Sequence, residues 1–371
     1  MTDRAAWLRL ATTPGIGATL AARLIERFGS VEAALAGSDT AWREVGLSAP
    51  TRRALAEPPG DGLTATEAWL AEDGHHFLTV DDASYPAALA ELDPPPPWLY
   101  ALGDLDLLDY PAIAIVGSRN PTHAGREAAH EFGRALAAAG LVVVSGLARG
   151  IDAAAHEGAL DADGFTIAVT GTGLDRVYPA ANKALAERIA ERGLLLSEFG
   201  LGTHPARGNF PRRNRVIAGL CTATLVVEAA RASGSLITAR MASAANREVF
   251  ALPGSIHNPL ARGCHQLIRE GAKLVETTDH ILEEIAGSIG GYRRRPTTGI
   301  EAGMKTSTAA ESTGQDDSDE LLTAIGHDPV RIDDLVARTG WKADAVSSTL
   351  LILELEGRVQ AVAGGAYIRS A

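Results

Sequence analysis

The chain has 371 residues, of which 46% are hydrophobic and 22% are charged, and its formal net charge is −12 at pH 7. At roughly 150 residues per domain this length predicts two or three domains, and the apolar content excludes a globally disordered chain. The two cysteines, Cys221 and Cys264, are too few for a disulfide framework and suit a reducing compartment. The charged N-terminus predicts no secretion signal, and no apolar run reaches the ~20 residues that cross a bilayer, so we expect a cytoplasmic protein without a membrane segment.

The negative charge is unevenly distributed along the chain. Residues 31–110 contain 15 acidic and 3 basic residues, a deficit as large as that of the whole chain. Between Glu198 and Glu228 there is no acidic residue, and four arginines fall in this interval. The net charge argues against a phosphate-rich partner, but the local electrostatic field in the middle of the chain can still attract an anion.

Residues 1–75 predict an N-terminal helical domain. The segment Thr13–Gly17, followed by the amphipathic segment Leu20–Gly29, is similar to a helix-hairpin-helix motif of the SAM-like type. In that motif the hairpin glycines expose backbone N–H groups to DNA phosphates, but the same pattern also serves as a packing hairpin between protein segments. Both functions stay open for this domain.

Residues 76–288 predict a Rossmann-like core, in which a stiff segment, Pro94–Pro97, precedes a short strand over Trp98–Leu102. Seven further apolar strands are expected at residues 112–116, 141–144, 166–169, 194–196, 223–227, 249–252 and 273–275. Amphipathic helices, such as those expected at 122–139 and 181–192, lie between them. Helices of this length between fully apolar strands indicate an α/β fold with a doubly wound, mostly parallel sheet.

The C-terminal part divides into two segments. Residues 289–319 are rich in Gly, Ser, Thr and charge, which is typical of a flexible linker. Residues 320–371 predict a winged-helix domain, with a helix-turn-helix followed by two strands around Gly364 and Gly365. The expected recognition helix, residues 341–357, contains three acids against Lys342 alone. This charge disfavours reading of a DNA groove and leaves a protein contact open.

Six loops that follow the predicted strands of the core are built largely from Gly, Ser, Thr and Arg. In open α/β sheets ligands bind at the carboxyl ends of the strands, where glycine allows close backbone approach and helix N-termini present N–H groups to phosphate oxygens. These loops therefore predict an elongated anion site. The candidate residues in them are Gly117, Ser118, Arg119, Ser145, Gly146, Arg149, Lys183, Ser233, Gly234 and Ser235.

The segment Asn209–Gly219 is the most informative stretch of the chain. It places Phe210 beside Arg212, Arg213, Asn214 and Arg215 at the start of an expected helix. Arginines bind phosphates, and an exposed aromatic ring stacks on an unpaired base. A helix N-terminus disfavours cations unless an anion is bound nearby, so the arginines indicate an anionic ligand. Phe210 can equally be a buried core residue, and that alternative stays open.

Several catalytic or cofactor sites are disfavoured by the residue pattern. The turn after residues 112–116 lacks the G-x-G-x-x-G fingerprint of NAD-binding folds. Ser145, Asp152 and His156 do not form a hydrolytic triad, because no G-x-S-x-G elbow is present and the last two share one helix. The adjacent pair Cys264 and His265 is too little for a metal site. We therefore expect no catalytic residue, no metal and no cofactor.

Taken in this order, the motifs resemble the DNA-processing protein A family (DprA, also called Smf). The segments that carry the resemblance are Tyr85-Pro86, Trp98–Gly103, Val116–Arg119, Ser145–Asp152, Tyr178-Pro179, Asn209–Arg215, Ser233–Ala239 and Gly263–Ala272. The resemblance implies that the core binds single-stranded DNA and forms homodimers. It also implies a protein that protects incoming strands during natural transformation and helps load the RecA recombinase onto them.

Two alternatives compete with this interpretation. The first is an enzyme on a similar core, such as a nucleotide phosphoribohydrolase, whose P-G-G-x-G-T-x-x-E segment corresponds here to residues 232–238, which lack the acid. The second is a transcription regulator that binds duplex DNA through the winged helix, which the acidic recognition helix disfavours. The sequence thus favours a non-enzymatic protein that binds single-stranded DNA.

Overall fold

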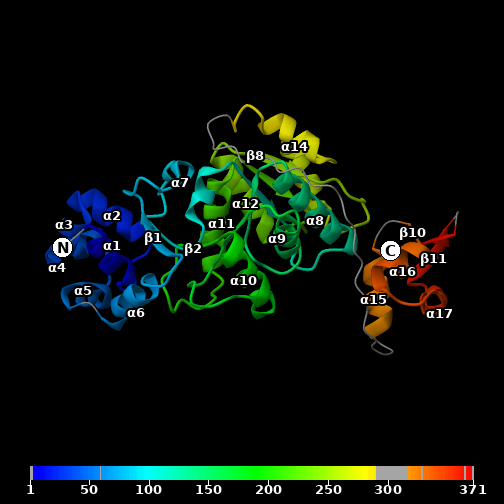
Figure 1. The fold of residues 1–371 in the computed structure, drawn as a ribbon, viewed down its shortest axis with the longest axis horizontal. Helices are drawn as coiled ribbons and strands as arrows, with labels where there is room; N and C mark the ends of the chain where they lie inside the picture. The colour runs from blue at the N-terminus through cyan, green and yellow to red at the C-terminus, as the bar shows by residue number, and fades with distance from the viewer. Residues whose placement is uncertain (1–2, 59, 290–315, 327–328, 363–364, 370–371) are drawn as a thin grey trace.

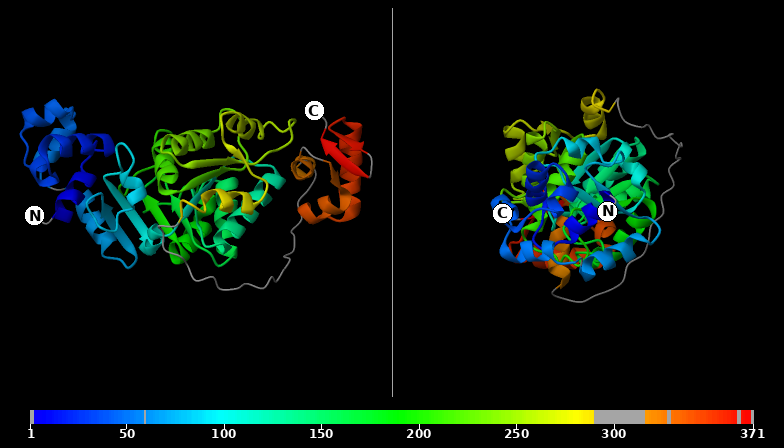
Figure 2. Two further views of the ribbon diagram at one scale, coloured as in Figure 1. Left: turned by 90° about the horizontal axis from the view of Figure 1, so that it is seen from above. Right: turned by 90° about the vertical axis from the view of Figure 1, so that its left-hand side faces the viewer.

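The structure is a computed structural model that describes residues 3–58, 60–289, 316–326, 329–362 and 365–369. Three bodies follow one another along the molecule: a group of N-terminal helices, a core built around a sheet, and a C-terminal winged helix (Figure 1). The view from above keeps the same arrangement (Figure 2). Most of the expected linker lies outside the described residues, and its last part belongs to a helix that begins at Asp316. Among the described residues, no helix has the length and apolar composition of a membrane span.

Six helices form the N-terminal body: α1 (Asp3–Thr12), α2 (Ala18–Phe28), α3 (Val31–Leu35), α4 (Asp39–Val45), α5 (Ala49–Ala56) and α6 (Asp61–Leu70). Serine hydroxyls cap three of them, because Ser30, Ser38 and Ser48 each accept a hydrogen bond from the backbone N–H three residues later. The ring of Trp7 is buried and meets that of Trp98 edge-on at 6.3 Å. This contact joins the helical body to the sheet.

The central sheet has nine strands in the order β1-β2-β6-β5-β4-β3-β7-β8-β9. Their bounds are β1 (His75–Thr79), β2 (Trp98–Gly103), β3 (Ala112–Val116), β4 (Val142–Ser145), β5 (Thr166–Val169), β6 (Leu194–Ser197), β7 (Ala223–Val226), β8 (Glu248–Ala251) and β9 (Lys273–Leu274). Strands β3 to β9 pair in parallel, whereas β2 pairs antiparallel with β6 and with β1. The seven strands predicted beyond residue 111 are confirmed, each to within one residue at either end.

Helices cover both faces of this sheet. Successive residues of a strand point to opposite faces, and in these strands both sets are apolar. On β3, for example, Ile113 and Ile115 belong to one buried cluster and Ala114 and Val116 to another. Helices α8 (His123–Ala138), α9 (Ile151–Asp161), α10 (Lys183–Arg192) and α14 (Thr278–Ile285) pack on one side. Helices α7 (Ala87–Ala90), α11 (Asn209–Leu220), α12 (Gly234–Ala244) and α13 (Arg262–Arg269) pack on the other. Two short 3-10 helices lie at Leu105–Asp109 and Ala180–Asn182.

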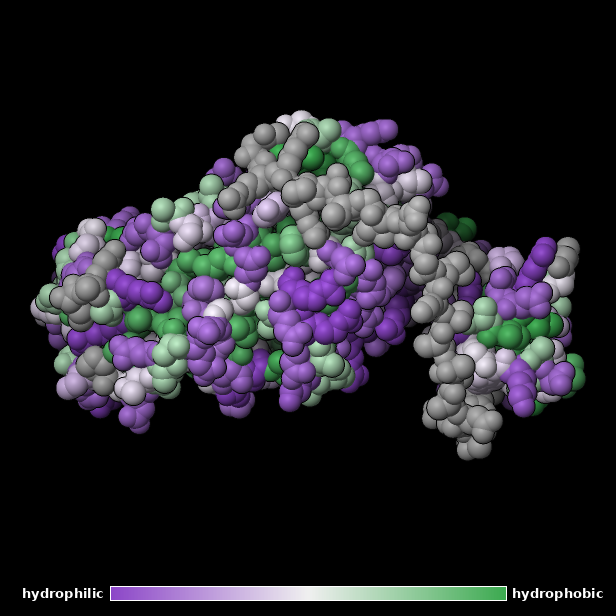
Figure 3. Space-filling view, in the orientation of Figure 1, coloured by the Kyte–Doolittle hydropathy of each residue, from purple (hydrophilic) through white to green (hydrophobic). Residues whose placement is uncertain are grey.

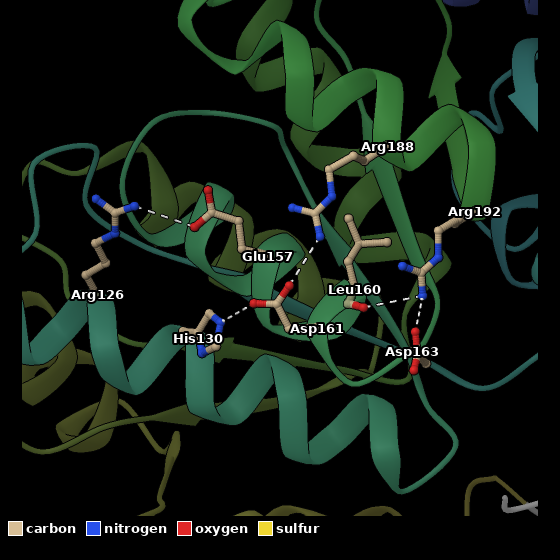
Figure 4. Close-up of polar contacts among 8 residues, drawn as sticks. All are labelled: Arg126, His130, Glu157, Leu160, Asp161, Asp163, Arg188 and Arg192. Carbon is tan, nitrogen blue, oxygen red and sulfur yellow. Dashed lines mark hydrogen bonds and ion pairs between the residues drawn. The ribbon is translucent and has the colours of Figure 1, made fainter. Parts of the chain in front are cut away.

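Ion pairs connect α8, α9 and α10 on the outer surface of the core (Figure 4). Asp161 bridges two helices, since its carboxylate lies 3.0 Å from His130 Nε2 and 3.2 Å from Arg188 Nη2. Although partial burial acts to raise it, hydrogen bonds from His130 and Arg188 hold the pKa of Asp161 below its usual value. Arg126 pairs with Glu157 at 3.5 Å on the same surface. Hydrophilic residues cover this region in the space-filling view (Figure 3), and Arg126 and Arg188 are already paired.

The C-terminal body is the predicted winged helix. Its elements are α15 (Asp316–Ile325), β10 (Val330–Arg331), α16 (Ile332–Thr339), α17 (Ala343–Leu355), β11 (Val359–Val362) and β12 (Ala366–Arg369). The three strands pair antiparallel in the order β10-β12-β11. Leu335, Leu350 and Leu353 are fully buried in its own small core. The fold class predicted from the sequence is therefore confirmed in all three bodies.

Candidate nucleic-acid interface

A cavity of about 530 Å³ opens at the carboxyl ends of β3 and β7. In the sheet, β4, β5 and β6 follow on one side of this pair and β8 and β9 on the other. The connections after β3 and β7 therefore lead in opposite directions and leave a crevice between the two loops. Nine of the predicted site residues line the cavity: Gly117, Ser118, Arg119, Phe210, Arg213, Asn214, Ser233, Gly234 and Ser235.

The loop after β3 packs closely against Ile151 and the backbone of Glu228, and it exposes Arg119. A Cβ atom on Gly117 would lie 2.6 Å from the Ile151 side chain and 2.9 Å from the carbonyl oxygen of Glu228. The backbone N–H of Ser118 donates a hydrogen bond of 2.7 Å to that same oxygen. Glycine is therefore needed for the close approach, and the tight turn leaves the side chain of Arg119 exposed at the mouth of the cavity.

Two helix N-termini meet at the cavity, those of α11 and α12. Neither helix has an acidic residue in its first turn, and no side chain caps α11. The Ser233 hydroxyl accepts a hydrogen bond of 3.3 Å from the Ser235 backbone N–H, and Asn214 Nδ2 donates one of 3.5 Å to the Gly234 carbonyl. The α8 N-terminus differs, because the Glu228 carboxylate accepts hydrogen bonds from the Thr122 N–H and hydroxyl. The α11 and α12 N-termini thus present positive ends of helix dipoles to a ligand.

Arg213 forms part of the cavity floor, but its guanidinium is bonded to internal partners, although the sequence predicted it as a ligand contact. Its side chain is buried and donates hydrogen bonds to the carbonyl oxygens of Gly146 and Val169. Asp152 lies close by and accepts hydrogen bonds from the backbone N–H groups of Gly146 and Ala148, at 3.1 and 3.3 Å. Burial raises the pKa of Asp152, which Arg213 opposes, and burial lowers the pKa of Arg213 to about 10. Arg213 therefore holds the loop after β4 in place.

Three other predicted residues have internal or local partners away from the cavity. The Ser145 hydroxyl is fully buried and donates to the Ile115 carbonyl oxygen at 2.6 Å. Arg215 forms an ion pair with Glu198, and the exposed Lys183 lies 3.8 Å from Glu187 on its own helix. Gly146 lies behind the cavity against the Arg213 guanidinium, where a side chain would collide with it.

The remaining two predicted arginines flank the cavity. The guanidinium of Arg212 is exposed, lies 5.1 Å above the ring centroid of Phe199 and borders the N-terminal hairpin at Gly17. Arg149 lines a second cavity of about 800 Å³, which shares Arg119 with the first and also includes Arg126. Asp319 and Glu320 of α15 line the far side of this second cavity. A basic path thus runs past the loop after β3, with acidic residues of the winged helix at one border.

Phe210 lies beside Arg119, and a second ring, Tyr178, packs on Phe210. The Arg119 guanidinium carbon is 5.2 Å from the ring centroid of Phe210, and the ring of Tyr178 lies 5.9 Å from that of Phe210 at an interplanar angle of 39°. Phe210 is only half-buried, so it is not a closed core residue. Ile237, which lines the cavity, and Tyr178, whose ring packs against Phe210, were not among the predicted site residues. The Tyr178-Pro179 motif could have identified Tyr178 from the sequence, whereas no sequence feature pointed to Ile237.

The residues that line this cavity are suited to an anionic ligand. Among the described residues that line it, Asp152 is the one carboxylate, and backbone N–H groups already engage its oxygen. Within the described ranges, His, Cys, Asp and Glu side chains form no group of three that could hold a metal. Arg119, two helix N-termini and the serine hydroxyls suit phosphate groups, and the neighbouring rings suit bases.

Comparison with known proteins identifies the family to which the chain belongs. The profile of the family described as DNA recombination-mediator protein A matches residues 76–286, that of the DprA-like N-terminal HHH domain residues 1–46, and that of the DprA winged helix domain residues 305–365. Protein Smf of Synechocystis is 36% identical over 99% of both chains. DNA processing protein DprA of Streptococcus pneumoniae is 50% identical over 56% of this chain and 73% of its own length.

Two solved structures are similar as well. The X-ray structure of DprA from Streptococcus pneumoniae matches with a TM-score of 0.66 and 37% identity, over 76% of this chain and 98% of that chain. The structure of DNA processing protein A from Helicobacter pylori, described for its single-stranded DNA binding mode, matches with a TM-score of 0.53 and 32% identity, over 58% of this chain and 97% of that chain. The chain therefore belongs to the DNA recombination-mediator protein A family, the DprA proteins.

Proposed function

We propose that this protein binds single-stranded DNA at the 530 Å³ cavity, protects incoming strands during natural transformation and helps load the RecA recombinase onto them. The observation that carries the proposal is the position of the exposed Arg119, beside Phe210 and at the N-termini of α11 and α12. One phosphate between Arg119 and these helix ends would place its neighbouring base beside the aromatic rings. The similar structure from Helicobacter pylori, described for single-stranded DNA binding, supports this ligand.

The DNA strand would extend beyond the cavity on both sides. Arg149 lines the adjoining cavity, and Arg212 on α11 and Arg207 in the loop before it are exposed. Each phosphate that such residues neutralise adds affinity and salt dependence. Arg213 and Arg215 would contribute by holding the loops and α11 in place, because their guanidinium groups already have internal partners.

An enzymatic function is the second candidate, and the cavity favours it less. A phosphoribohydrolase needs a carboxylate that faces the ribose, whereas residues 232–238 supply only serine and threonine as polar side chains. Asp152 is oriented toward the loop backbone by its hydrogen bonds. We therefore propose a binding protein without catalytic residues.

Homodimer formation through the core is part of the proposal. The edge strand β9 pairs only with β8 among the described strands, and Leu274 on it is 48% exposed. An unpaired edge with an exposed leucine suits pairing with a second copy, and two copies would double the length of DNA bound. Sedimentation of Leu274→Asp beside the unchanged protein tests this part: a dimer that persists in the variant excludes the β9 edge.

Titration of a fluorescent dT oligomer and of a matching duplex, at several salt concentrations, tests the proposed function. We expect tighter binding of the single strand, with log K falling by about 0.7 per neutralised phosphate for each tenfold rise in salt. Arg119→Ala should weaken binding at least tenfold, while Arg188→Ala, which removes an arginine paired with Asp161, should leave it unchanged. Equal or tighter binding of the duplex would overturn the proposal. Release of a free base from nucleoside monophosphates would favour the enzyme instead.

A further inference from the structure

Two exposed side chains lie in or beside the proposed DNA site, where phosphate binding alone gives them no function: Ile237 lines the cavity, and Tyr178 packs on Phe210, which lines it. Tyr178 is 45% exposed and is the one aromatic residue among the large exposed hydrophobics of the described chain. Ile237 is 38% exposed and lines the 530 Å³ cavity. Phosphate oxygens need donors and positive charge, whereas apolar surface gains free energy only when another apolar or aromatic group covers it. Their position therefore indicates a ligand with flat, weakly polar groups.

Phe210 is the inner ring of this cluster and Tyr178 is the outer one. Arg119 and the Tyr178 ring both contact Phe210, and a Cβ on Gly171 would lie 3.2 Å from its edge. These neighbours leave Phe210 half-buried, while nearly half of Tyr178 is open to solvent. The accessible aromatic surface at this site thus belongs mainly to Tyr178.

The loop that carries Tyr178 is fixed to the other loops of the site. Asn209 Nδ2, at the start of α11, donates a hydrogen bond of 3.0 Å to the Gly171 carbonyl. Asn182 Nδ2, beyond Tyr178, donates one of 2.9 Å to the Leu147 carbonyl. The segment 171–182 is therefore anchored at both ends, and the ring is held in place before a ligand binds, which lowers the entropy cost of stacking.

We propose that Tyr178 is a base-stacking residue, and that it makes the site select unpaired bases as well as phosphates. This inference rests on the proposed function and assigns a contact within it. An unpaired base can lay its face on the Tyr178 ring with its phosphate at Arg119, whereas in a duplex both faces of each base are already stacked on neighbours. Ile237 would contact a further base or sugar across the cavity. Stacking of this kind contributes about tenfold in affinity per base.

The test compares two oligomers of equal length and charge, one of dT and one in which every base is replaced by an abasic residue. For Tyr178→Ala we expect about tenfold weaker binding of the dT oligomer and unchanged binding of the abasic one. Tyr178→Phe, which keeps the ring, should bind both like the unchanged protein. Arg119→Ala should weaken both, because it removes a phosphate contact. Since Tyr178 is exposed, we expect the melting temperatures of its variants to stay the same.

Two other outcomes would contradict the inference and can be told apart. If the unchanged protein binds dT tightly and Tyr178→Ala does so equally, or loses as much affinity for the abasic oligomer, Tyr178 does not stack on a base while the proposed function stands. If the unchanged protein binds neither oligomer, the proposed function fails and the inference fails with it.

Discussion

Arg215 forms a bidentate ion pair with Glu198 in which only 3% of the Glu198 side chain is exposed. The same guanidinium donates a hydrogen bond of 2.5 Å to the Pro94 carbonyl oxygen. One side chain thus joins α11, the end of β6 and the proline segment before β2. This contact supports the geometry of the proposed DNA site, since α11 carries Phe210 and Arg212.

Arg215→Ala should therefore destabilise the fold. Removal of one partner of a buried ion pair leaves the other charge uncompensated, which costs about 3–5 kcal/mol in the free energy of unfolding. Urea denaturation would measure this loss, with the exposed Arg212→Ala as the matched control of small effect. A variant that kept its stability but bound dT weakly would instead make Arg215 a direct DNA contact.

Arg213→Met should destabilise the protein, and increasingly so as pH rises. Burial already raises the pKa of Asp152, and removal of the Arg213 charge that opposes this effect raises it further. A carboxyl group whose pKa is higher in the folded than in the unfolded state favours folding at low pH and loses that contribution as pH rises through the folded pKa. Chemical denaturation between pH 5 and pH 8 would show the slope. Adding Asp152→Asn should restore stability near pH 8; a double variant no more stable than Arg213→Met would show that the Asp152 charge is not the cause.

The arginines of α11 show what the sequence could and could not predict. The buried positions Val216, Ile217 and Leu220 follow Arg213 at spacings of three, four and seven residues, so Arg213 lies on the apolar face of the helix. That periodicity was available in the sequence, and it separates Arg213 from the exposed Arg212. The partner of Arg215 was not available, because Glu198 belongs to a distant loop and meets it only in the folded chain.

In the rest of the molecule, too, features with a local sequence pattern were predicted, and features that depend on contacts in the folded chain were not. Fully apolar strands between helices, as at 112–116 and 223–227, predicted the parallel sheet and the edge at which its Gly- and Ser-rich loops meet. β1 was missed because two of its residues, His75 and His76, are polar and it lies at the expected domain boundary. Tyr178 lies in a loop without periodicity, so only the folded structure places its ring beside Phe210.

His156 should make the stability of the protein decrease as pH falls. It is fully buried, and Thr166 Oγ1 donates to the Val143 carbonyl, so the His156 Nδ1–H donates to Thr166 Oγ1 over 2.6 Å. Burial lowers its pKa to about 3. Between about pH 6.5 and pH 3 the unfolded state therefore binds a proton that the folded state does not, and stability falls toward low pH.

Because of His156, the free energy of unfolding should be about 2 kcal/mol lower at pH 5 than at pH 7. Urea denaturation at the two pH values should show a smaller difference for His156→Asn, whose amide can still donate to Thr166. His257→Asn, at an exposed histidine, serves as the control and should keep the difference of the unchanged protein. An undiminished difference in His156→Asn would exclude His156 as its source.

The winged helix should weaken DNA binding through its acidic helix α15. Glu320 lines the second cavity opposite Arg119, Arg126 and Arg149, so its negative charge lowers the positive potential along the proposed DNA path. Glu320→Lys changes the net charge by two units near that path and should strengthen dT binding about fivefold at low salt. Asp344→Lys makes the same change on α17, away from both cavities, and controls for net charge. The gain should vanish near 1 M salt, where the screening length falls to about 3 Å; equal gains in both variants would attribute the effect to net charge alone.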